Sequence, residues 1–264
     1  MAWQYCSVER QGRIAIVRFD RGMAANPLSA AAMRELTDVA LELDKDIETS
    51  VVVLAGGEKN FSMGFDLKDQ ETAEIRNAPM LERRKRLQTG PRMCRAWEEL
   101  EQMTICAIEG WCVGGGSALA TALDLRVMGE SATMYVPEIE RGMNMSWNSV
   151  PRFVNLVGPA KTKRIVVMAE KIKADRALDW GLADEVVADG NTLEKALEMA
   201  EVIAAMPPVG VRMCKRDIDM AAKALNTAVS YNDLDQYALA QNGKDYDEGV
   251  LSFIEKRPPN FTGG

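Results

Sequence analysis

The sequence predicts an α/β core followed by a helical C-terminal region. Apolar runs typical of buried strands alternate with amphipathic helical patterns over residues 1–190, and almost every later segment has helical periodicity. We therefore expect a core over residues 1–190 and a helical region over 191–264. With 264 residues, 47% of them hydrophobic and 27% charged, the chain can form one large core or a core with a smaller appendage.

Strands and helices alternate from the N-terminus onward. Two apolar runs around Gln11 and Gly12 predict a hairpin, and the run SVVVLAG predicts a buried strand. Ser29 is a suitable N-cap for the helical pattern AAAMRELTDVALELDKD. The densely charged residues 71–90, with the basic stretch MLERRKRL, have no period, so we expect a surface segment there. A helix and then a strand are expected next, over 91–103 and 104–109.

Shorter elements follow in the second half of the chain. The stretches LRVMGE and ATMYVPE predict short strands, whereas WNSVPRFVNLVG, PAKTKRIVVMA and ADRALDWGLA predict helices separated by turns. Pro207 and Pro208 begin a new helix. Because the helices after Asn191 have broad apolar faces, we expect them to pack against other subunits in an oligomer.

Composition and charge exclude several classes of protein. The net charge of −7 disfavours nucleic acid as a partner. No apolar stretch reaches the roughly 18 residues that span a bilayer, and the first residues lack the apolar core of a signal peptide. The five cysteines form no C-x-x-C pair and are odd in number, which is typical of reduced thiols. We therefore expect a cytoplasmic protein with no membrane partner.

The chain contains no histidine. This absence excludes Ser-His-Asp and Cys-His nucleophile systems, and it excludes histidine-ligated zinc. Acid–base chemistry must therefore use carboxylates, tyrosine, lysine, cysteine or water. We expect no metal site.

A glycine cluster joins a predicted strand to a predicted helix in the segment TICAIEGWCVGGGSALA. Gly114, Gly115 and Gly116 lack a Cβ, so the backbone can approach a ligand closely. The first N–H groups of a helix have no intrahelical partner, and the helix dipole favours negative charge there. The segment is therefore suited to holding an anion with main-chain atoms, or equally to making a tight turn with close helix–sheet packing. It lacks the G-x-G-x-x-G spacing of a dinucleotide site.

Two further segments carry groups that suit catalysis. FSMGFDLK is another strand, glycine turn and helix start, so N–H groups from two loops could converge on one oxygen as an oxyanion hole. In VPEIERG, Glu138 follows a Val-Pro pair, which restricts the backbone to non-helical conformations. Beside an apolar pocket its pKa would rise, as suits a general acid or base. The alternative is a surface glutamate at the end of a strand.

Together these segments resemble the crotonase superfamily, the enoyl-CoA hydratases and isomerases, over nearly the whole chain. The segment VRFDR…NPLS is similar to the start of the family pattern. FSMGFDLK is similar to its F-x-x-G-x-D-[LI]-K loop, and IEGWCVGGGSALATALDLRV to its G-x-x-x-G-G-G-x-x-L-x-x-x-x-D segment. Further matches, in the expected order, are VPEIERG, ADRALDWGLADEVV and EGVLSFIEKRPPNF.

The resemblance implies a crotonase-like spiral of ββα units with a C-terminal helical trimerisation region, assembled as a homo-trimer or hexamer. It implies an acyl-CoA substrate whose thioester carbonyl becomes an enolate, with no cofactor beyond the coenzyme A of the substrate. By motif position, the oxyanion donors are the N–H groups of Phe65 and Gly115. Other residues that the motifs place around the thioester are Gly64, Asp66, Gly114 and Gly116. Lys68 and Lys256 are candidates for the coenzyme A phosphates, or are solvated surface lysines.

One position departs from the hydratase pattern. Family hydratases carry two glutamates, and here Ala118 replaces the first while Glu138 retains the second. A single carboxylate still suffices to move a proton between two carbons of one enolate, as in family isomerases. Hydroxycinnamoyl-CoA hydratase-lyases also lack the first glutamate, but here Gln70 stands where they have a tyrosine. Tyr231 is a candidate for their second tyrosine, or packs between helices.

The stretch after Glu138 separates this chain from another branch of the superfamily. Dehalogenases need an aspartate nucleophile there, whereas this chain has Met145, Ser146, Trp147 and Asn148. Where hydratases are rich in glycine, Ser146 and Trp147 are candidates to bind the substrate. Trp147 either lines the acyl pocket or packs in the core.

We therefore expect an acyl-CoA enzyme that uses Glu138 as its single acid/base in isomerisation or hydration of an enoyl-CoA. A hydratase-lyase acting on an aryl enoyl-CoA is the alternative enzyme. A non-catalytic acyl-CoA-binding protein is the alternative from another class, and retention of Glu138 argues against it. RNA binding, which some relatives show, is disfavoured by the acidic net charge.

Overall fold

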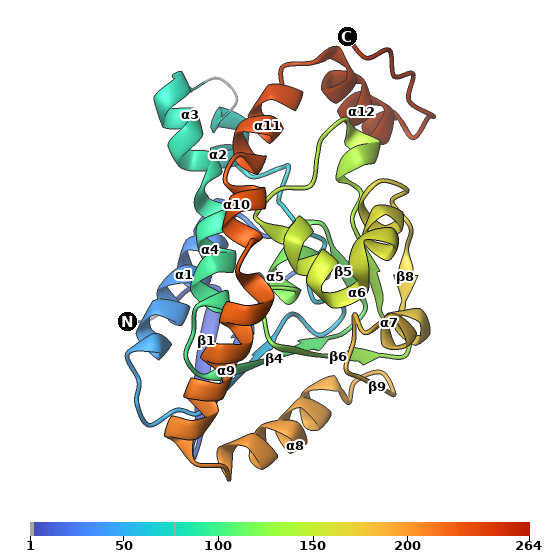
Figure 1. Cartoon of the computed structure of the whole chain (residues 1–264). Coiled ribbons are helices and arrows are strands. Elements are labelled where there is room, and N and C mark those ends of the chain that lie inside the picture. Colours follow the sequence, from blue (N-terminus) through green and yellow to red (C-terminus); the bar gives the residue numbers. More distant parts are fainter. Residues whose placement is uncertain (1–2, 76–77) are drawn as a thin grey trace.

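The main sheet forms the centre of the computed structural model, which describes residues 3–75 and 78–264 (Figure 1). Within these residues the sheet has six strands in the order β1-β2-β3-β4-β6-β9. Strands β1 and β2 form an antiparallel hairpin, and all later neighbours in the sheet are parallel. The strands are β1 (Cys6–Gln11), β2 (Ile14–Phe19), β3 (Val51–Ala55), β4 (Met103–Ile108), β6 (Leu125–Gly129) and β9 (Glu185–Val187).

A smaller sheet has the order β5-β7-β8 and contains β5 (Trp111–Val113), β7 (Thr133–Tyr135) and β8 (Ile172–Lys173). The chain passes repeatedly from the main sheet to the small sheet and then into a helical turn. Strands β4 and β5 lead to α5 (Gly115–Ala120), and β6 and β7 lead to the 3₁₀ turn η1 (Glu138–Arg141). The predicted spiral of ββα units is confirmed, and it sets the ends of β5 and β7 side by side.

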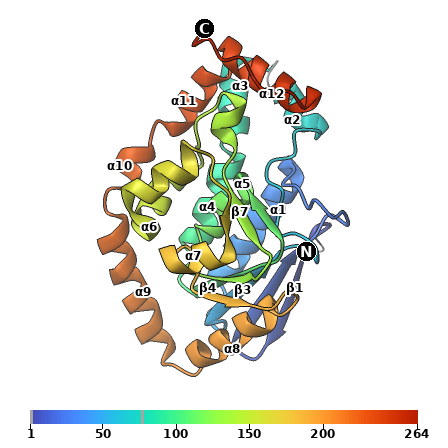
Figure 2. The ribbon, with the colours of Figure 1, turned by 90° about the vertical axis from the view of Figure 1, so that its right-hand side faces the viewer.

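Helices cover both faces of the main sheet (Figure 2). Alternate residues of β3 enter two separate apolar clusters: Val52 and Leu54 join one, and Val51 and Val53 join the other. The first cluster includes residues from the helices α1 (Ala30–Asp44) and α4 (Thr89–Glu98), and the second includes α8 (Thr192–Ala204). Because both faces are covered, the strand SVVVLAG is apolar throughout rather than alternating.

The chain after α8 runs back along the molecule and ends near α3 and η1 (Figures 1 and 2). Its helices are α9 (Pro208–Lys223), α10 (Asn226–Ser230), α11 (Asp233–Ala240) and α12 (Lys244–Glu255). Helix α12 packs on η1, and α11 contacts α3. The remaining helices are α2 (Gln70–Ile75), α3 (Met80–Leu87), α6 (Ser149–Val166) and α7 (Ala174–Trp180). The C-terminal helices therefore lie close to the turn that carries Glu138.

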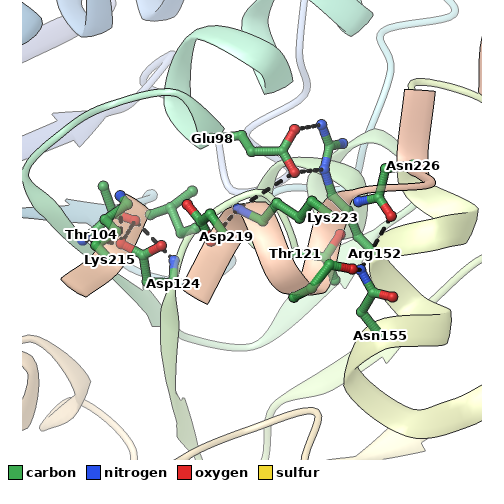
Figure 3. Close-up of polar contacts among 12 residues, drawn as sticks. Glu98, Thr104, Thr121, Asp124, Arg152, Asn155, Lys215, Asp219, Lys223 and Asn226 are labelled. Carbon is green, nitrogen blue, oxygen red and sulfur yellow. Dashed lines mark hydrogen bonds and ion pairs between the residues drawn. The ribbon is translucent and has the colours of Figure 1, made fainter. Parts of the chain in front are cut away.

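Ion pairs attach α9 to the core (Figure 3). The buried Lys215 Nζ lies 2.7 Å from Asp124 Oδ2 and donates to the carbonyl of Gln102 at 2.8 Å. Farther along the helix, Lys223 Nζ lies 3.7 Å from Glu98 Oε1. Glu98 also accepts a 2.6 Å hydrogen bond from Arg152 Nη2 of α6. Burial of these charges is offset by pairing, so α9 depends on specific partners in the core.

Most predicted elements are present with small shifts at their ends. The N-cap at Ser29 is confirmed, because its Oγ accepts a hydrogen bond from the Ala32 N–H at 3.2 Å. Residues 71–90 lie mostly at the surface within their described part, as expected, and there the chain forms α2 and α3. The basic stretch MLERRKRL is the solvated helix α3, which buries only Arg83. The short strand β5 was missed, as it continues the apolar run of β4 beyond Gly110.

Candidate active site

Two loops meet where β5 ends. Ser62 donates its N–H to the Trp111 carbonyl, and its own carbonyl accepts from the Val113 N–H at 2.9 Å. Gly64 has φ +87°, and a Cβ built there would lie 2.6 Å from the Val113 oxygen and 3.4 Å from the Gly115 nitrogen. Only glycine permits this approach. The loop after β3 is therefore pressed against the start of α5.

The N–H groups of Phe65 and Gly115 are available at this junction. The neighbours of Phe65 are bonded elsewhere: Asp66 N–H donates to the Leu28 carbonyl, and the Gly64 carbonyl accepts from Leu28 N–H. Gly115 is the first residue of α5, so its N–H has no acceptor within the helix. Among the described residues, neither N–H has a protein acceptor. The two loops thus present two N–H groups that can donate hydrogen bonds to an incoming carbonyl oxygen.

Glu138 lies against the glycine cluster. A Cβ built on Gly114, which has φ +52°, would lie 2.6 Å from Glu138 Oε1. The Gly114 N–H donates to the Tyr135 carbonyl at 2.8 Å, which aligns the glycine loop with the strand that leads into η1. Glu138 Oε2 is shielded from solvent and has no hydrogen-bond partner within residues 3–75 and 78–264. The carboxylate is therefore held next to Gly114, and its Oε2 has no partner among the described residues.

Burial changes the acidity of Glu138. Desolvation raises the pKa of this carboxyl from 4.5 to about 7, although its own backbone N–H and the nearby Arg141 oppose the shift. A group with such a pKa exchanges protons readily near neutral pH. Glu138 is thus equipped to act as an acid and as a base.

Each glycine of the cluster makes room for a different side chain. Gly114 accommodates Glu138, and a Cβ on Gly116 would lie 3.0 Å from Ser62 Cβ. A Cβ on Gly115 would lie 2.6 Å from Cζ3 of the Trp147 indole. The sequence leaves two interpretations of these glycines open, close approach of a ligand and a tight turn with close helix–sheet packing. The structure shows that they are also required for packing against the protein's own side chains.

The remaining predicted site residues divide into buried and exposed groups. Ala118 has no accessible surface, and Ser146 is buried with its carbonyl accepting from Ser149 Oγ at 2.6 Å. Asp66 accepts a hydrogen bond from Arg21 Nη1 at 2.5 Å, which makes it a structural member of its loop. Lys68 and Lys256 lie on the surface.

Tyr231 is 77% exposed, so it does not pack between helices of this chain. Its expected place in the site stays a prediction. The tyrosine on the site side is Tyr237 of α11, whose pKa is raised by burial and then by the nearby Tyr246 and Glu138. Its hydroxyl accepts from Gln241 Nε2 at 3.2 Å, and Gln241 Oε1 accepts from Arg83 Nη2 at 2.9 Å. The helical pattern of DLDQYALAQ does not distinguish this tyrosine from a packing residue.

Other features of the surface lie away from this junction. Two hollows of about 260 and 290 Å³ are lined mainly by helices, and neither is lined by Glu138, Phe65 or Gly115. Among the described residues, no group of three or more cysteine and carboxylate side chains could hold a metal ion. No helix within the same residues is long and apolar enough to cross a membrane.

The junction defines a class of site: two backbone N–H groups without a protein acceptor among the described residues, together with a carboxylate whose Oε2 is shielded from solvent. Comparison with known proteins identifies a family with this chain's fold. The family model described as enoyl-CoA hydratase/isomerase matches residues 9–264. The short-chain-enoyl-CoA hydratase of Clostridium acetobutylicum is 31% identical over 95% of this chain and 94% of its own. The 2,3-dehydroadipyl-CoA hydratase of Escherichia coli is 28% identical over 97% and 98%.

Solved structures show the same fold. The carnitinyl-CoA hydratase from Mycobacterium avium superposes with a TM-score of 0.86 at 32% identity, covering 99% of both chains. An enoyl-CoA hydratase from Mycobacterium avium subsp. paratuberculosis gives a TM-score of 0.87 at 20% identity, covering 99% of this chain and 100% of that one, which establishes the fold alone. The chain belongs to the enoyl-CoA hydratase/isomerase family and is an enzyme of that type.

Proposed function

We propose that this enzyme moves a proton along an enoyl-CoA through a thioester enolate, with Glu138 as its single acid/base. The observation that carries the proposal is the half-buried Glu138 beside Gly114, whose Oε2 is shielded from solvent and has no partner among the described residues. The N–H groups of Phe65 and Gly115 donate hydrogen bonds to the carbonyl oxygen and stabilise the negative charge that develops on it. Glu138 removes a proton from C2 of a 3-enoyl thioester and returns it to C4, so the double bond moves and no atom is lost.

The first glutamate position of the hydratase pattern, occupied here by Ala118, favours isomerisation over hydration. Addition of water needs a group that activates the water while another protonates carbon. Ala118 offers only a methyl group there and has no accessible surface. Hydration is nevertheless the second candidate, because the relatives that span almost the whole chain are named hydratases. A hydratase-lyase acting on an aryl substrate is favoured by one observation, a tyrosine of α11, Tyr237, whose pKa the charge of Glu138 helps to raise.

The proposed substrate is an acyl-CoA, and the proposed assembly is a homo-trimer or hexamer. Large apolar side chains on α9 and α12 are exposed in the single chain, among them Met213, Ile218, Phe253 and Ile254. Such faces are typical of subunit interfaces. All five cysteines are free, which supports a cytoplasmic location. Coenzyme A enters as part of the substrate, and we propose no further cofactor.

Incubation of the protein with 2-enoyl- and 3-enoyl-CoA thioesters in D₂O tests the proposal. We expect 3-enoyl-CoA to become 2-enoyl-CoA of the same composition, with deuterium gained at carbon. Mass spectrometry distinguishes this result from hydration, which adds the mass of water. Cleavage of an aryl thioester to an aldehyde would identify a hydratase-lyase. If no thioester in aliphatic and aryl series reacts or exchanges, the protein is a binder and the proposal fails.

The pH dependence should follow the raised pKa of Glu138. In the free enzyme the base must be deprotonated, so kcat/KM for isomerisation should rise with pH through about 7 and then level off. Stability should change in the opposite direction. Between pH 4.5 and about 7 the folded state retains a proton that the unfolded state loses, so the free energy of unfolding falls as pH rises through this window. A kcat/KM that falls above pH 7 would indicate that Glu138 acts first as an acid.

A further inference from the structure

The Trp147 indole covers the glycine that provides one of the backbone donors. A Cβ on Gly115 would lie 2.6 and 2.7 Å from indole carbons Cζ3 and Cη2. The ring of Phe65, the residue with the other donor, stands edge-on to the indole with centroids 6.2 Å apart at 90°. Both donor residues therefore contact the same aromatic side chain.

The other edge of the indole is seated on a glycine of α4. A Cβ on Gly90 would lie 2.1 Å from Trp147 Cε2, closer than any real contact permits. Gly90 lies in the first turns of a helix, where glycine is less favourable than alanine by roughly 1 kcal/mol. A glycine at position 90 is thus needed to make room for the Trp147 ring and does not serve helix formation.

The backbone around Trp147 is held in an uncommon conformation. Trp147 and Asn148 have φ of +62° and +56°, which side chains other than glycine seldom adopt. Arg152 Nη1 donates to the Trp147 carbonyl at 2.9 Å, and Asp233 Oδ2 accepts from the Asn148 N–H at 2.8 Å. Such a conformation persists where surrounding contacts over-determine it, as they do here. The position of the indole is therefore fixed.

We propose that Trp147 is the specificity-determining residue of this enzyme and restricts it to thioesters of short, unbranched acids. The inference rests on the proposed function. An acyl group begins at the thioester carbonyl, and that carbonyl is held at Phe65 and Gly115. The indole covers Gly115, so the acyl carbons nearest the thioester contact the ring. Bulky or long acyl groups need the volume that the indole fills.

Binding of saturated acyl-CoA thioesters tests the proposal without requiring turnover. Isothermal titration of the wild-type protein with butyryl-, hexanoyl-, octanoyl- and dihydrocinnamoyl-CoA should show at least a tenfold loss of affinity from butyryl to the last two. Equal or tighter binding of the large thioesters overturns the proposal. Since these ligands have no double bond, failure of the proposed isomerisation in the enoyl-CoA assay is a separate result.

Variants then assign the selectivity to the indole. Trp147→Ala should improve binding of octanoyl-CoA relative to butyryl-CoA by at least tenfold, and Trp147→Phe should give an intermediate ratio. Gly90→Ala, which displaces the ring without removing it, should change the same ratio. Trp180→Ala is the matched control: Trp180 is 8% exposed and packs under arginines of α6 and α7. It should lower stability and leave the ratio unchanged.

An unchanged ratio in a folded Trp147→Ala protein overturns the assignment. If that variant does not fold, the ratio for Trp147→Phe and Gly90→Ala decides in the same way. A ratio that changes equally in Trp180→Ala also overturns it, because the effect would then reflect general loosening of the core.

Discussion

Replacing Glu138 by glutamine should abolish turnover while leaving the affinity for coenzyme A esters within a few-fold. The amide has the shape of the carboxyl group but cannot take up a proton from carbon. Positioned acid–base groups contribute roughly 10²–10⁴-fold to rate, and here one group both removes and returns the proton. Binding should survive because the thioester carbonyl is held by backbone N–H groups of other residues. Steady-state kinetics on the true substrate, with titration of a saturated thioester, separates the two effects.

Glu140→Gln is the matched control for this change. Glu140 lies in the same 3₁₀ turn, is exposed, and accepts a hydrogen bond from the Tyr135 hydroxyl. It has no place beside the glycine cluster, so its amide variant should keep near wild-type kcat. A Glu138→Gln enzyme that retains near wild-type rate would disprove the single-base mechanism. A loss of the same size in Glu140→Gln would show that the turn, and not the carboxyl group, was damaged.

The second large effect is expected for Gly115→Pro, which should lower kcat by roughly 10²–10³, the usual cost of one oxyanion donor. Gly115 is the first residue of α5, a position where proline fits the helix and its missing N–H breaks no intrahelical bond. The change therefore removes the donor from a helix that can still form. The new ring atoms meet the indole of Trp147, so the rate must be compared with that of Gly115→Ala.

Gly115→Ala retains the N–H and adds only the Cβ that strikes the indole. It should raise KM and change acyl preference more than it slows bound chemistry. Circular dichroism and thermal unfolding establish that both variants fold. If Gly115→Pro is folded and keeps its rate, the N–H of this residue is not the donor. If both variants lose kcat equally, the displaced indole and not the missing N–H is responsible.

Local patterns in the sequence were sufficient to predict much of the fold. The hairpin, the N-cap at Ser29 and the helix that begins at Pro208 depend on neighbouring residues, so their signals are close together in the chain. The motif match placed Glu138 near the glycine cluster, and the structure supplies the contact, Oε1 against Gly114. What these patterns could not provide is the reason for each glycine, because that depends on which side chain arrives from elsewhere.

The contacts that were missed join distant parts of the chain. Gly90 and Trp147 meet only because α4 and the loop before α6 converge, and neither residue marks the other in sequence. Tyr237 and Tyr231 lie in similar helical patterns, but Tyr237 is partly buried and feels the charge of Glu138, whereas Tyr231 is exposed. The charge on α3 indicated a solvated helix face but gave no sign that its buried member, Arg83, bonds to Gln241 and Asn242 at the end of α11.

The attachment of α9 has a consequence for how the chain folds. Lys215 is 5% exposed, and its ammonium group has Asp124 and the Gln102 carbonyl as partners. Asp124 in turn accepts from the N–H and hydroxyl of Thr104, at the start of β4. A chain ending at residue 190 would leave this carboxylate without its cation and uncover the sheet face that α8 protects. Secondary structure changes near residue 190, but the contacts continue across it, so we expect the sheet and the C-terminal helices to unfold together.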